Sequence, residues 1–281
     1  MTATAGLRVG WSPLEYDVDP DWLRPPDGIA VGPVTAVAAA NDGRLYVCHR
    51  SQPSVLIVDS GGSVTGALGK DTITDPHGIT TDDAGNVYVA DRDRHVVLIF
   101  DAAGRLTQEI GTRDHAASEA PFNHPAGVAV APDGAILVAD GYGNSRIHVF
   151  APQGDHLTSW GEHGRGPGQF RVPHGIAVDP DGHVYVADRE NDRVQVFDRS
   201  GKLLNMWDGF KGPTGVCVDG FGRIFVTDHV PTLTALSGDG EVLFRVRAYH
   251  DTHGVCCDRN GNVFVASTAG RAVVAYKPLH A

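Results

Sequence analysis

One motif recurs six times along this chain of 281 residues, and that repeat restricts the fold more than any other feature. The copies begin at Val34, Pro76, Pro125, Pro173, Pro213 and Thr252. Each copy holds short runs rich in Val and Ile, separated by turns rich in Gly, which is the pattern of antiparallel strands. A period of about 40 to 50 residues with four such strands is typical of a propeller blade. We therefore predict an all-β, six-bladed β-propeller.

The two ends of the chain are expected to meet in the last blade. The copy from Thr252 ends near Tyr276 without a fourth strand of its own, and the segment Leu7–Trp11 precedes the first copy. An N-terminal strand in the last blade would close the ring and remove open sheet edges. We expect the region around Leu7–Trp11 to supply this strand, so that residues 1–281 form a single propeller domain.

Charge and hydropathy exclude several classes of function. Asp and Glu total 34 against 23 Lys and Arg, a formal net charge of -11, and the arginines are scattered among aspartates. A nucleic-acid partner is not expected for such a surface. No run approaches the roughly 20 apolar residues that cross a bilayer, and the first residues show no basic stretch followed by an apolar run. We expect no membrane partner and a cytoplasmic location.

The four cysteines, Cys48, Cys217, Cys256 and Cys257, lie within apolar, strand-like runs. None is paired at the two-residue spacing of a zinc site. We predict buried, reduced thiols, and a disulfide or a cysteine metal site is the alternative.

The longest insertion between copies is the glycine-rich segment GEHGRGPGQF, from Gly161 to Phe170. We expect it to be a surface loop near the rim of the site and a candidate lid.

Three histidines occupy the same position in every second copy of the repeat. In a propeller the first strand of a blade is innermost, so this position enters the central channel. Around the ring it reads Thr35, His77, Ala126, His174, Thr214 and His253. A single histidine at a strand start is more often structural, but alternation through a closed ring of six predicts a tripod. Three neutral imidazoles with an open position suit a divalent ion, zinc first, with iron, cobalt, nickel and copper also compatible.

A second ring of side chains is expected at the turn after the second strand, because antiparallel strands return that turn to the same face. The aligned pairs are His49-Arg50, Asp91-Arg92, Asp140-Gly141, Asp188-Arg189, Asp228-His229 and Ser267-Thr268. The aspartates recur whether or not the blade carries a histidine of the tripod. We therefore assign them to turn hydrogen bonds and to pairing with arginines between neighbouring blades.

Two residues of this second ring are candidates for chemistry. Arg50 follows His49 in place of the usual Asp, which predicts an unpaired guanidinium near the axis, suited to a carboxylate or a developing oxyanion. A plain surface arginine is the alternative. Tyr142 stands between glycines in DGYGNSR, where core packing does not require an aromatic ring. Its hydroxyl can serve as a base, or its ring can stack on a ligand.

The repeats, of the form PxGVAVxxDGxVYVAD, resemble NHL repeats over nearly the whole chain. The segments FNHPAGVAV, VADGYGNSRIHVF, GEHGRGPGQFRVPHGIAV and VADRENDRVQVF, between Phe122 and Phe197, resemble the catalytic core of peptidyl-α-hydroxyglycine α-amidating lyase. That family cleaves the N–C bond of a carbinolamide and releases an amide and glyoxylate.

The resemblance implies a role for each candidate residue. It implies that zinc is held by His77 in DPHGI, His174 in VPHGI and His253 in DTHGV. It further implies that Arg50 in CHRSQ is the catalytic arginine, that Tyr142 takes the hydroxyl proton, and that Arg189 in DRENDR binds substrate or shapes the site.

The chain departs from this family at three positions. Gly143 replaces a disulfide-forming cysteine beside the tyrosine, and Gly254 replaces an acidic residue that helps to hold a structural calcium. Asp251 stands where the family has an apolar residue. We therefore expect neither the disulfide nor the structural Ca2+ to carry over, and we expect an altered charge near His253.

These observations predict a metal-dependent lyase that cleaves the C–N bond of an α-hydroxy amide. The expected partner is a small-molecule substrate, such as an N-acyl α-hydroxy compound, instead of a secreted peptide. One alternative is a hydrolase of a lactone or amide that uses the same metal to activate water. The other is a non-catalytic NHL module that binds a protein or ligand on its top face. Protein partners and oligomeric state are not predicted.

Overall fold

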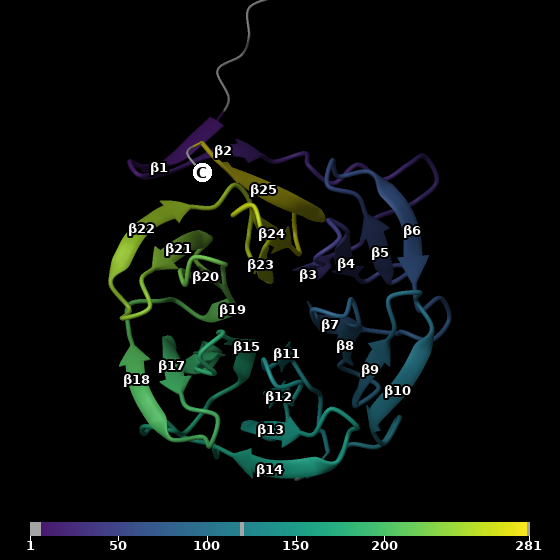
Figure 1. Cartoon of the computed structure of the whole chain (residues 1–281), viewed down its shortest axis with the longest axis vertical. Coiled ribbons are helices and arrows are strands. Elements are labelled where there is room, and N and C mark those ends of the chain that lie inside the picture. Colours follow the sequence, from purple (N-terminus) through teal and green to yellow (C-terminus); the bar gives the residue numbers. More distant parts are fainter. Residues whose placement is uncertain (1–6, 119–120, 280–281) are drawn as a thin grey trace, which may run out of the picture.

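Six antiparallel sheets surround a central axis in the computed structural model, which describes residues 7–118 and 121–279 (Figure 1). Each sheet is one blade, and its innermost strand faces the axis. The prediction of an all-β, six-bladed propeller is confirmed. The one helical element among these residues is a 3-10 turn, η1 (Arg189–Asn191). None of the helical structure in the described part of the chain has the length and hydropathy to span a membrane.

The strands follow the repeat in order. Blade 1 contains β3 (Val34–Ala39), β4 (Leu45–His49), β5 (Val55–Val58) and β6 (Val64–Leu68). Blade 2 contains β7 (Pro76–Thr81), β8 (Val87–Asp91), β9 (Val96–Phe100) and β10 (Leu106–Gly111). Blade 3 contains β11 (Gly127–Val130), β12 (Ile136–Asp140), β13 (Arg146–Phe150) and β14 (His156–Trp160).

The second half of the ring repeats this arrangement. Blade 4 contains β15 (Pro173–Val178), β16 (Val184–Asp188), β17 (Arg193–Phe197) and β18 (Leu203–Trp207). Blade 5 contains β19 (Pro213–Val218), β20 (Ile224–Asp228), β21 (Thr232–Leu236) and β22 (Val242–Arg247). Blade 6 contains β23 (Val255–Cys257), β24 (Val263–Ser267), β25 (Ala272–Pro278), β2 (Leu14–Asp19) and β1 (Leu7–Trp11).

The turn between the first two strands of a blade shows why the repeat folds as it does. In blade 4, Asp179 accepts hydrogen bonds from the backbone N–H of His183, at 2.8 Å, and from the hydroxyl of Tyr185, at 3.0 Å. Gly182 has a φ of +87°, a conformation that glycine adopts at little cost. This Asp and Gly therefore reverse the chain between the two strands of blade 4.

The hydrophobic core is divided among the interfaces between neighbouring blades. Strand residues point alternately to the two faces of each sheet, and both faces pack on an adjacent blade. One buried cluster joins blades 1 and 2, and further clusters join each following pair around the ring, including blades 6 and 1. This packing fixes the innermost strands, and with them the residues that face the channel.

The ring closes with an N-terminal strand, as predicted, but the strand is a different one. β2 pairs with β25, placing Tyr16 opposite Pro278, whereas β1 pairs only with β2 and adds a fifth strand. The prediction that Leu7–Trp11 supplies the closing strand is therefore wrong. Tyr16 is 1% exposed and packs against Phe225 and Phe244, whereas Trp11 in β1 is 55% exposed. Burial of the Tyr16 face selects β2 as the partner of β25.

The segment from Gly161 to Phe170 is held against blade 4 by a buried arginine. Arg193 pairs with Asp188 at 2.8 Å and donates hydrogen bonds to the carbonyl oxygens of Arg165, Gly166 and Gln169. Asn191 donates to Gly164 at 2.9 Å. Since Asn191 belongs to the turn after β16, the loop lies on the rim where that turn emerges, and these bonds attach it there.

The four cysteines are free, as predicted. Cys48 and Cys256 are buried, but Cys217 and Cys257 are partly exposed. The prediction of burial is wrong for these two because their strands, β19 and β23, line the channel.

Candidate metal centre

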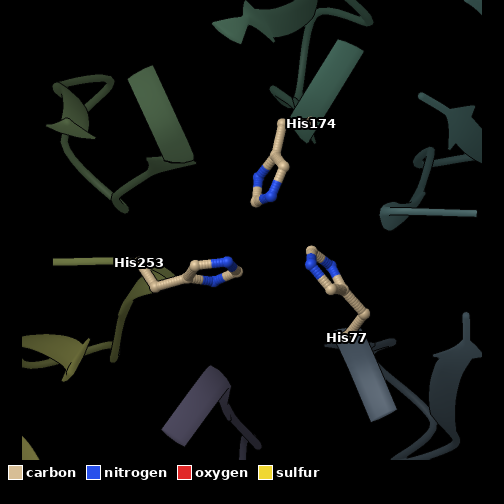
Figure 2. Close-up of side chains that lie close together, drawn as sticks. All are labelled: His77, His174 and His253. Carbon is tan, nitrogen blue, oxygen red and sulfur yellow. The ribbon is translucent and has the colours of Figure 1, made fainter. Parts of the chain in front are cut away.

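The three histidines of the repeat converge on the axis of the ring. His77 lies on β7 and His174 on β15, whereas His253 lies two residues before the start of β23. The ring centroids are 4.8, 4.9 and 4.7 Å apart for the three pairs. Figure 2 shows the imidazoles pointing toward a common centre. The structure thus brings together the residues that the alternation of the repeat selected.

Each imidazole is oriented by the backbone of the next blade. Nδ1 of His77 lies 2.8 Å from the carbonyl oxygen of Ala126. Nδ1 of His174 lies 2.6 Å from that of Thr214, and Nδ1 of His253 lies 2.6 Å from that of Thr35. A carbonyl oxygen only accepts, so each Nδ1 must carry the proton and donate it. The lone pair of each neutral ring is then on Nε2, the tautomer required for a metal ligand.

Burial keeps the three rings neutral. It lowers the pKa of His77 and His174 well below the ordinary value of an imidazole, and the neighbouring His253 lowers both further. Burial also lowers the pKa of His253 to about 4, against a hydrogen bond to Thr35 that acts to raise it. Neutral imidazole is the form that binds metal ions, so the tripod is ready for one at neutral pH.

The glycine after each histidine permits this close arrangement. A Cβ at Gly78 would lie 2.7 Å from the Ala126 carbonyl oxygen, and one at Gly254 would lie 2.8 Å from the Ala36 Cα. Only a residue without a side chain lets the innermost strands approach so closely. A carboxylate side chain at residue 254 has no room, which agrees with the expectation that the calcium ligand of the lyase family does not carry over.

The donor set fits a divalent metal ion. One ligand atom from each of His77, His174 and His253 can be chosen so that all lie within 4.8 Å of one another. The histidines line a cavity of about 60 Å³ together with the other first-strand residues Thr35, Ala126 and Thr214. Three neutral nitrogen donors suit zinc, iron, cobalt, nickel or copper.

Tyr142 lies directly over the tripod. Its Oη is 3.0 Å from Nε2 of His77 and 3.1 Å from Nε2 of His174, and Arg189 Nη1 donates to it at 3.1 Å. The Arg189 guanidinium also lies 5.1 Å from the centroid of the Tyr142 ring. Gly143 beside it must stay small, since a Cβ there would lie 2.2 Å from Asn123 Cγ. No cysteine fits at residue 143.

Arg50 is paired, contrary to the prediction of a free guanidinium. Its Nε lies 3.1 Å from Oδ1 of Asp75, and Nη2 of Arg92 lies 2.8 Å from Oδ2 of the same carboxylate. Asp75 comes from the neighbouring blade, just before β7, so alignment of the second turns could not reveal it. Burial raises the pKa of Asp75, and the charges of Arg50 and Arg92 oppose that rise.

The sequence predicted Arg92 in the second ring without a role in the site, and Asp75 is a site residue that it missed. The Arg92 guanidinium lies 5.3 Å from the centroid of the Tyr142 ring, and Arg189 lies over the same ring. The one signal available was Asp75 before Pro76, where the corresponding residue of blade 4 is Val172. The rim therefore carries three guanidinium groups, two of which share one buried carboxylate.

The recurrent aspartates serve the turns, as predicted. Asp91 accepts hydrogen bonds from the backbone of Thr74 and Asp75, Asp140 from that of Asn123, and Asp188 from that of Arg171. The expected arginine pairing between neighbouring blades is wrong for this set. The ion pair of Asp188 is with Arg193 of its own blade, because β16 and β17 place the two residues opposite each other.

Asp251 also serves a turn, in blade 6. Burial acts to raise the pKa of Asp251, but the hydroxyls of Ser267 and Thr268 and two backbone N–H groups lower it to about 2. It thereby takes the place of the aspartate that blades 2 to 5 carry at the repeat position of Ser267. Asp251 does not line the histidine cavity. The expected change of charge near His253 is therefore wrong for the cavity itself.

A second group of possible ligands consists of Asp179, Asp181 and His183. These residues form the turn between β15 and β16, at the opposite end of the channel from His174. Asp179 is already engaged there by His183, at 2.9 Å, and by Tyr185. The group belongs to the repeated turn, and its Asp181 is exposed, whereas two of the three histidines of the tripod are buried.

Comparisons with known proteins find NHL repeats in three of the six blades. The NHL repeat family matches residues 74–100, 122–150 and 170–197, which fall in blades 2, 3 and 4. Peptidyl-glycine alpha-amidating monooxygenase of Mus musculus is 38% identical over 87 residues, which are 29% of this chain and 9% of that protein. Its Xenopus laevis relative, monooxygenase B, is 28% identical over 315 residues, 94% of this chain and 36% of that protein. The chain thus spans only a minor part of either relative.

Among solved structures, a gluconolactonase from Xanthomonas campestris superposes with a TM-score of 0.71 over 98% of both chains, at 19% sequence identity. This likeness concerns the fold. The relatives and the solved structure named here are enzymes.

Proposed function

We propose that this propeller is a metal-dependent lyase that cleaves the C–N bond of an α-hydroxy amide to give an amide and an aldehyde such as glyoxylate. The observation that carries the proposal is the hydroxyl of Tyr142, within 3.0 and 3.1 Å of two Nε2 atoms of a neutral histidine tripod. The resemblance of the Tyr142 and histidine motifs to the amidating lyase supports it, as does sequence similarity to the amidating monooxygenases.

His77, His174 and His253 would hold the ion through Nε2, and zinc is the first candidate. When bound, the ion supplies a Lewis acid that polarises a substrate oxygen. The protein contributes the fixed tautomer: each Nδ1–H is committed to a backbone carbonyl, so none of the rings can turn its lone pair away.

Tyr142 transfers the proton of the substrate hydroxyl. Its Oη accepts this proton while giving its own proton to the departing nitrogen. The O–H bonding pair becomes the second bond of the new C=O group, and the C–N pair leaves with the nitrogen. Arg189 donates to Oη and lies over the ring, and it therefore holds the oxygen in place during both transfers.

The arginines of the rim bind the anionic part of the substrate. Arg50 and Arg92 are both directed by Asp75, which fixes two planar donor groups on one side of Tyr142. Arg50 binds the carboxylate or carbonyl oxygen of the substrate and stabilises charge that develops there. Arg189 belongs to blade 4, so it approaches Tyr142 of blade 3 from the side opposite to Arg92 of blade 2.

A second candidate is hydrolysis of a lactone or amide at the same tripod. A solved structure with this fold is named a gluconolactonase, and water activated by a metal is an established nucleophile. A third is a binding module without catalysis. The three differ in metal content and in products, so one set of measurements separates them.

The test combines elemental analysis with product identification. Purified wild type is compared with His77→Ala, His174→Ala and His253→Ala, and with His183→Ala as the control from the second ligand group. We expect stoichiometric divalent metal in the wild type and control only. Equal metal content in all five proteins would remove the tripod from the proposal.

Product analysis uses N-benzoyl-α-hydroxyglycine and gluconolactone. Release of benzamide and glyoxylate from the first compound supports the lyase. Release of benzoic acid, or ring opening of the lactone without carbinolamide cleavage, would replace it with the hydrolase.

A further inference from the structure

We propose that Cys217 and Cys257 are a redox-active dithiol that hydroperoxides oxidise to a disulfide linking blade 5 to blade 6. The two sulfur atoms lie 3.2 Å apart, closer than the van der Waals contact of two non-bonded sulfurs. They are 40 positions apart in the sequence and sit on the innermost strands of adjacent blades. The alignment of repeats gave no sign of this pairing.

The pair is reachable from the channel. Both cysteines are partly exposed, and both line a cavity of about 260 Å³ that continues along the innermost strands beyond the tripod. Cys48, by contrast, is 0% exposed and lies in the core between blades 1 and 2. A molecule as small as hydrogen peroxide can enter a cavity of that size.

A hydrogen bond joins the two thiols. Burial raises the pKa of Cys217, and the contact with Cys257 raises it further. Either sulfur can be the donor across this contact. Either can therefore react first with the oxidant, and the other then resolves the intermediate.

The chemistry balances with a hydroperoxide as the oxidant. One of the two sulfurs attacks the outer oxygen, the O–O bond breaks, and a sulfenic acid forms with release of water or an alcohol. The second sulfur then attacks the first and displaces water. The two thiols lose two electrons and two protons, and the hydroperoxide takes up both.

The disulfide would join blade 6, which contains both ends of the described chain, to blade 5. Tyr16 of the closing strand β2 belongs to the buried cluster between blades 5 and 6 against which both cysteines pack. A covalent link there opposes separation of blade 6 from the ring. We therefore expect the oxidised protein to have a higher Tm than the reduced protein.

The test exposes the intact, purified protein to hydrogen peroxide, blocks remaining thiols under denaturing conditions and maps tryptic peptides without reduction. The thiols titrated in the unfolded chain should fall from four to two. The peptides of residues 212–223 and 248–259 should appear joined, with the loss of two hydrogens. Four thiols after treatment, or a loss that leaves these two peptides unlinked, would overturn the proposal.

Variants separate the neighbouring cysteines. Cys256→Ser should retain the linked peptides, because Cys256 is buried and faces the core between blades 6 and 1. Cys217→Ser and Cys257→Ser should each abolish the link. A link that survives Cys257→Ser but is lost in Cys256→Ser would assign the bond to the wrong pair and contradict the proposal. If a variant fails to fold, fragmentation of the wild-type linked peptide distinguishes Cys256 from Cys257.

Discussion

His174 donates its Nδ1 proton to the backbone carbonyl of Thr214, 2.6 Å away in the next blade. The same relation joins His77 to Ala126 and His253 to Thr35. The three blades without a histidine therefore orient the histidines of the three blades that have one. Because the acceptors are backbone atoms, side-chain substitution at Thr214 leaves the tether intact, and the geometry of the tripod depends on the packing of the ring.

Tyr142→Phe tests the proton transfer. The variant keeps the ring under Arg92 and Arg189 but removes the oxygen, so we expect kcat for carbinolamide cleavage to fall by about 10² to 10⁴. Metal content should not change. Tyr185→Phe is the control, because its hydroxyl bonds Asp179 at the other end of the channel. Unchanged kcat in Tyr142→Phe would contradict the assigned role.

Asp75→Asn tests the shared carboxylate. Arg50 and Arg92 would lose their common ionic partner, and hydrogen bonds to charged groups contribute about 1.5 to 3 kcal/mol. We expect kcat/KM to fall roughly 10- to 100-fold, with metal content retained. In Asp93→Asn, which removes the exposed partner of Arg92, we expect little change. Equal losses in both variants would show that Asp75 has no special role.

The stability of the metal-free protein should decrease in mild acid. Folding holds the pKa of His253 at about 4, below its ordinary value of 6.5, so between these pH values the unfolded chain binds more protons. The stability that the neutral His253 contributes to the folded protein is complete above pH 6.5 and is lost as the pH falls toward 4. Each such histidine contributes about 1.4 kcal/mol per pH unit within its window.

Urea unfolding of the metal-free wild type and of His253→Gln at several pH values between 7.5 and 5 measures this effect. The difference in slope between the two proteins isolates His253 from His77 and His174, whose pKa values are also lowered by burial. Parallel curves for the two proteins would contradict the prediction.

Gly254→Ala tests the close approach of the innermost strands. The new Cβ would meet Ala36 Cα at 2.8 Å, and overpacking of this kind costs about 1 to 3 kcal/mol. Chemical denaturation should show that loss. Gly220→Ala is the matched control, because its Cβ would meet nothing within 4 Å, and we expect its stability to change by no more than about 0.5 kcal/mol. Similar stabilities for the two variants would refute the steric account.

The phase of the repeat was sufficient to predict the ring of blades and the convergence of His77, His174 and His253. In a closed ring, residues at the same position of each repeat lie at the same height and distance from the axis. The prediction therefore needed no detail of side-chain packing. The partner of Arg50 could not be found this way, because Asp75 precedes the repeat motif and reaches across to the neighbouring blade. The sulfur pair was missed for the same reason, since it joins positions that are not equivalent in their copies.

The closing strand shows a different limit. Both N-terminal segments, Leu7–Trp11 and Leu14–Asp19, have strand-like composition, and the choice between them depends on which one buries its side chains against blade 5. Tyr16 settles that choice by packing on Phe225 and Phe244. Such contacts arise only after the ring has formed, so local pattern could not rank the two segments.

The pairing of β2 with β25 also sets the order of events during protein synthesis. Tyr16 emerges from the ribosome long before its strand partner, the segment around Pro278. Until that segment is made, the Tyr16 side chain and the free edge of β2 remain without their native cover. Blades 1 to 5 can stack as they are translated, whereas the last blade assembles only after translation has passed residue 278, and the nascent chain must be protected from aggregation in that interval.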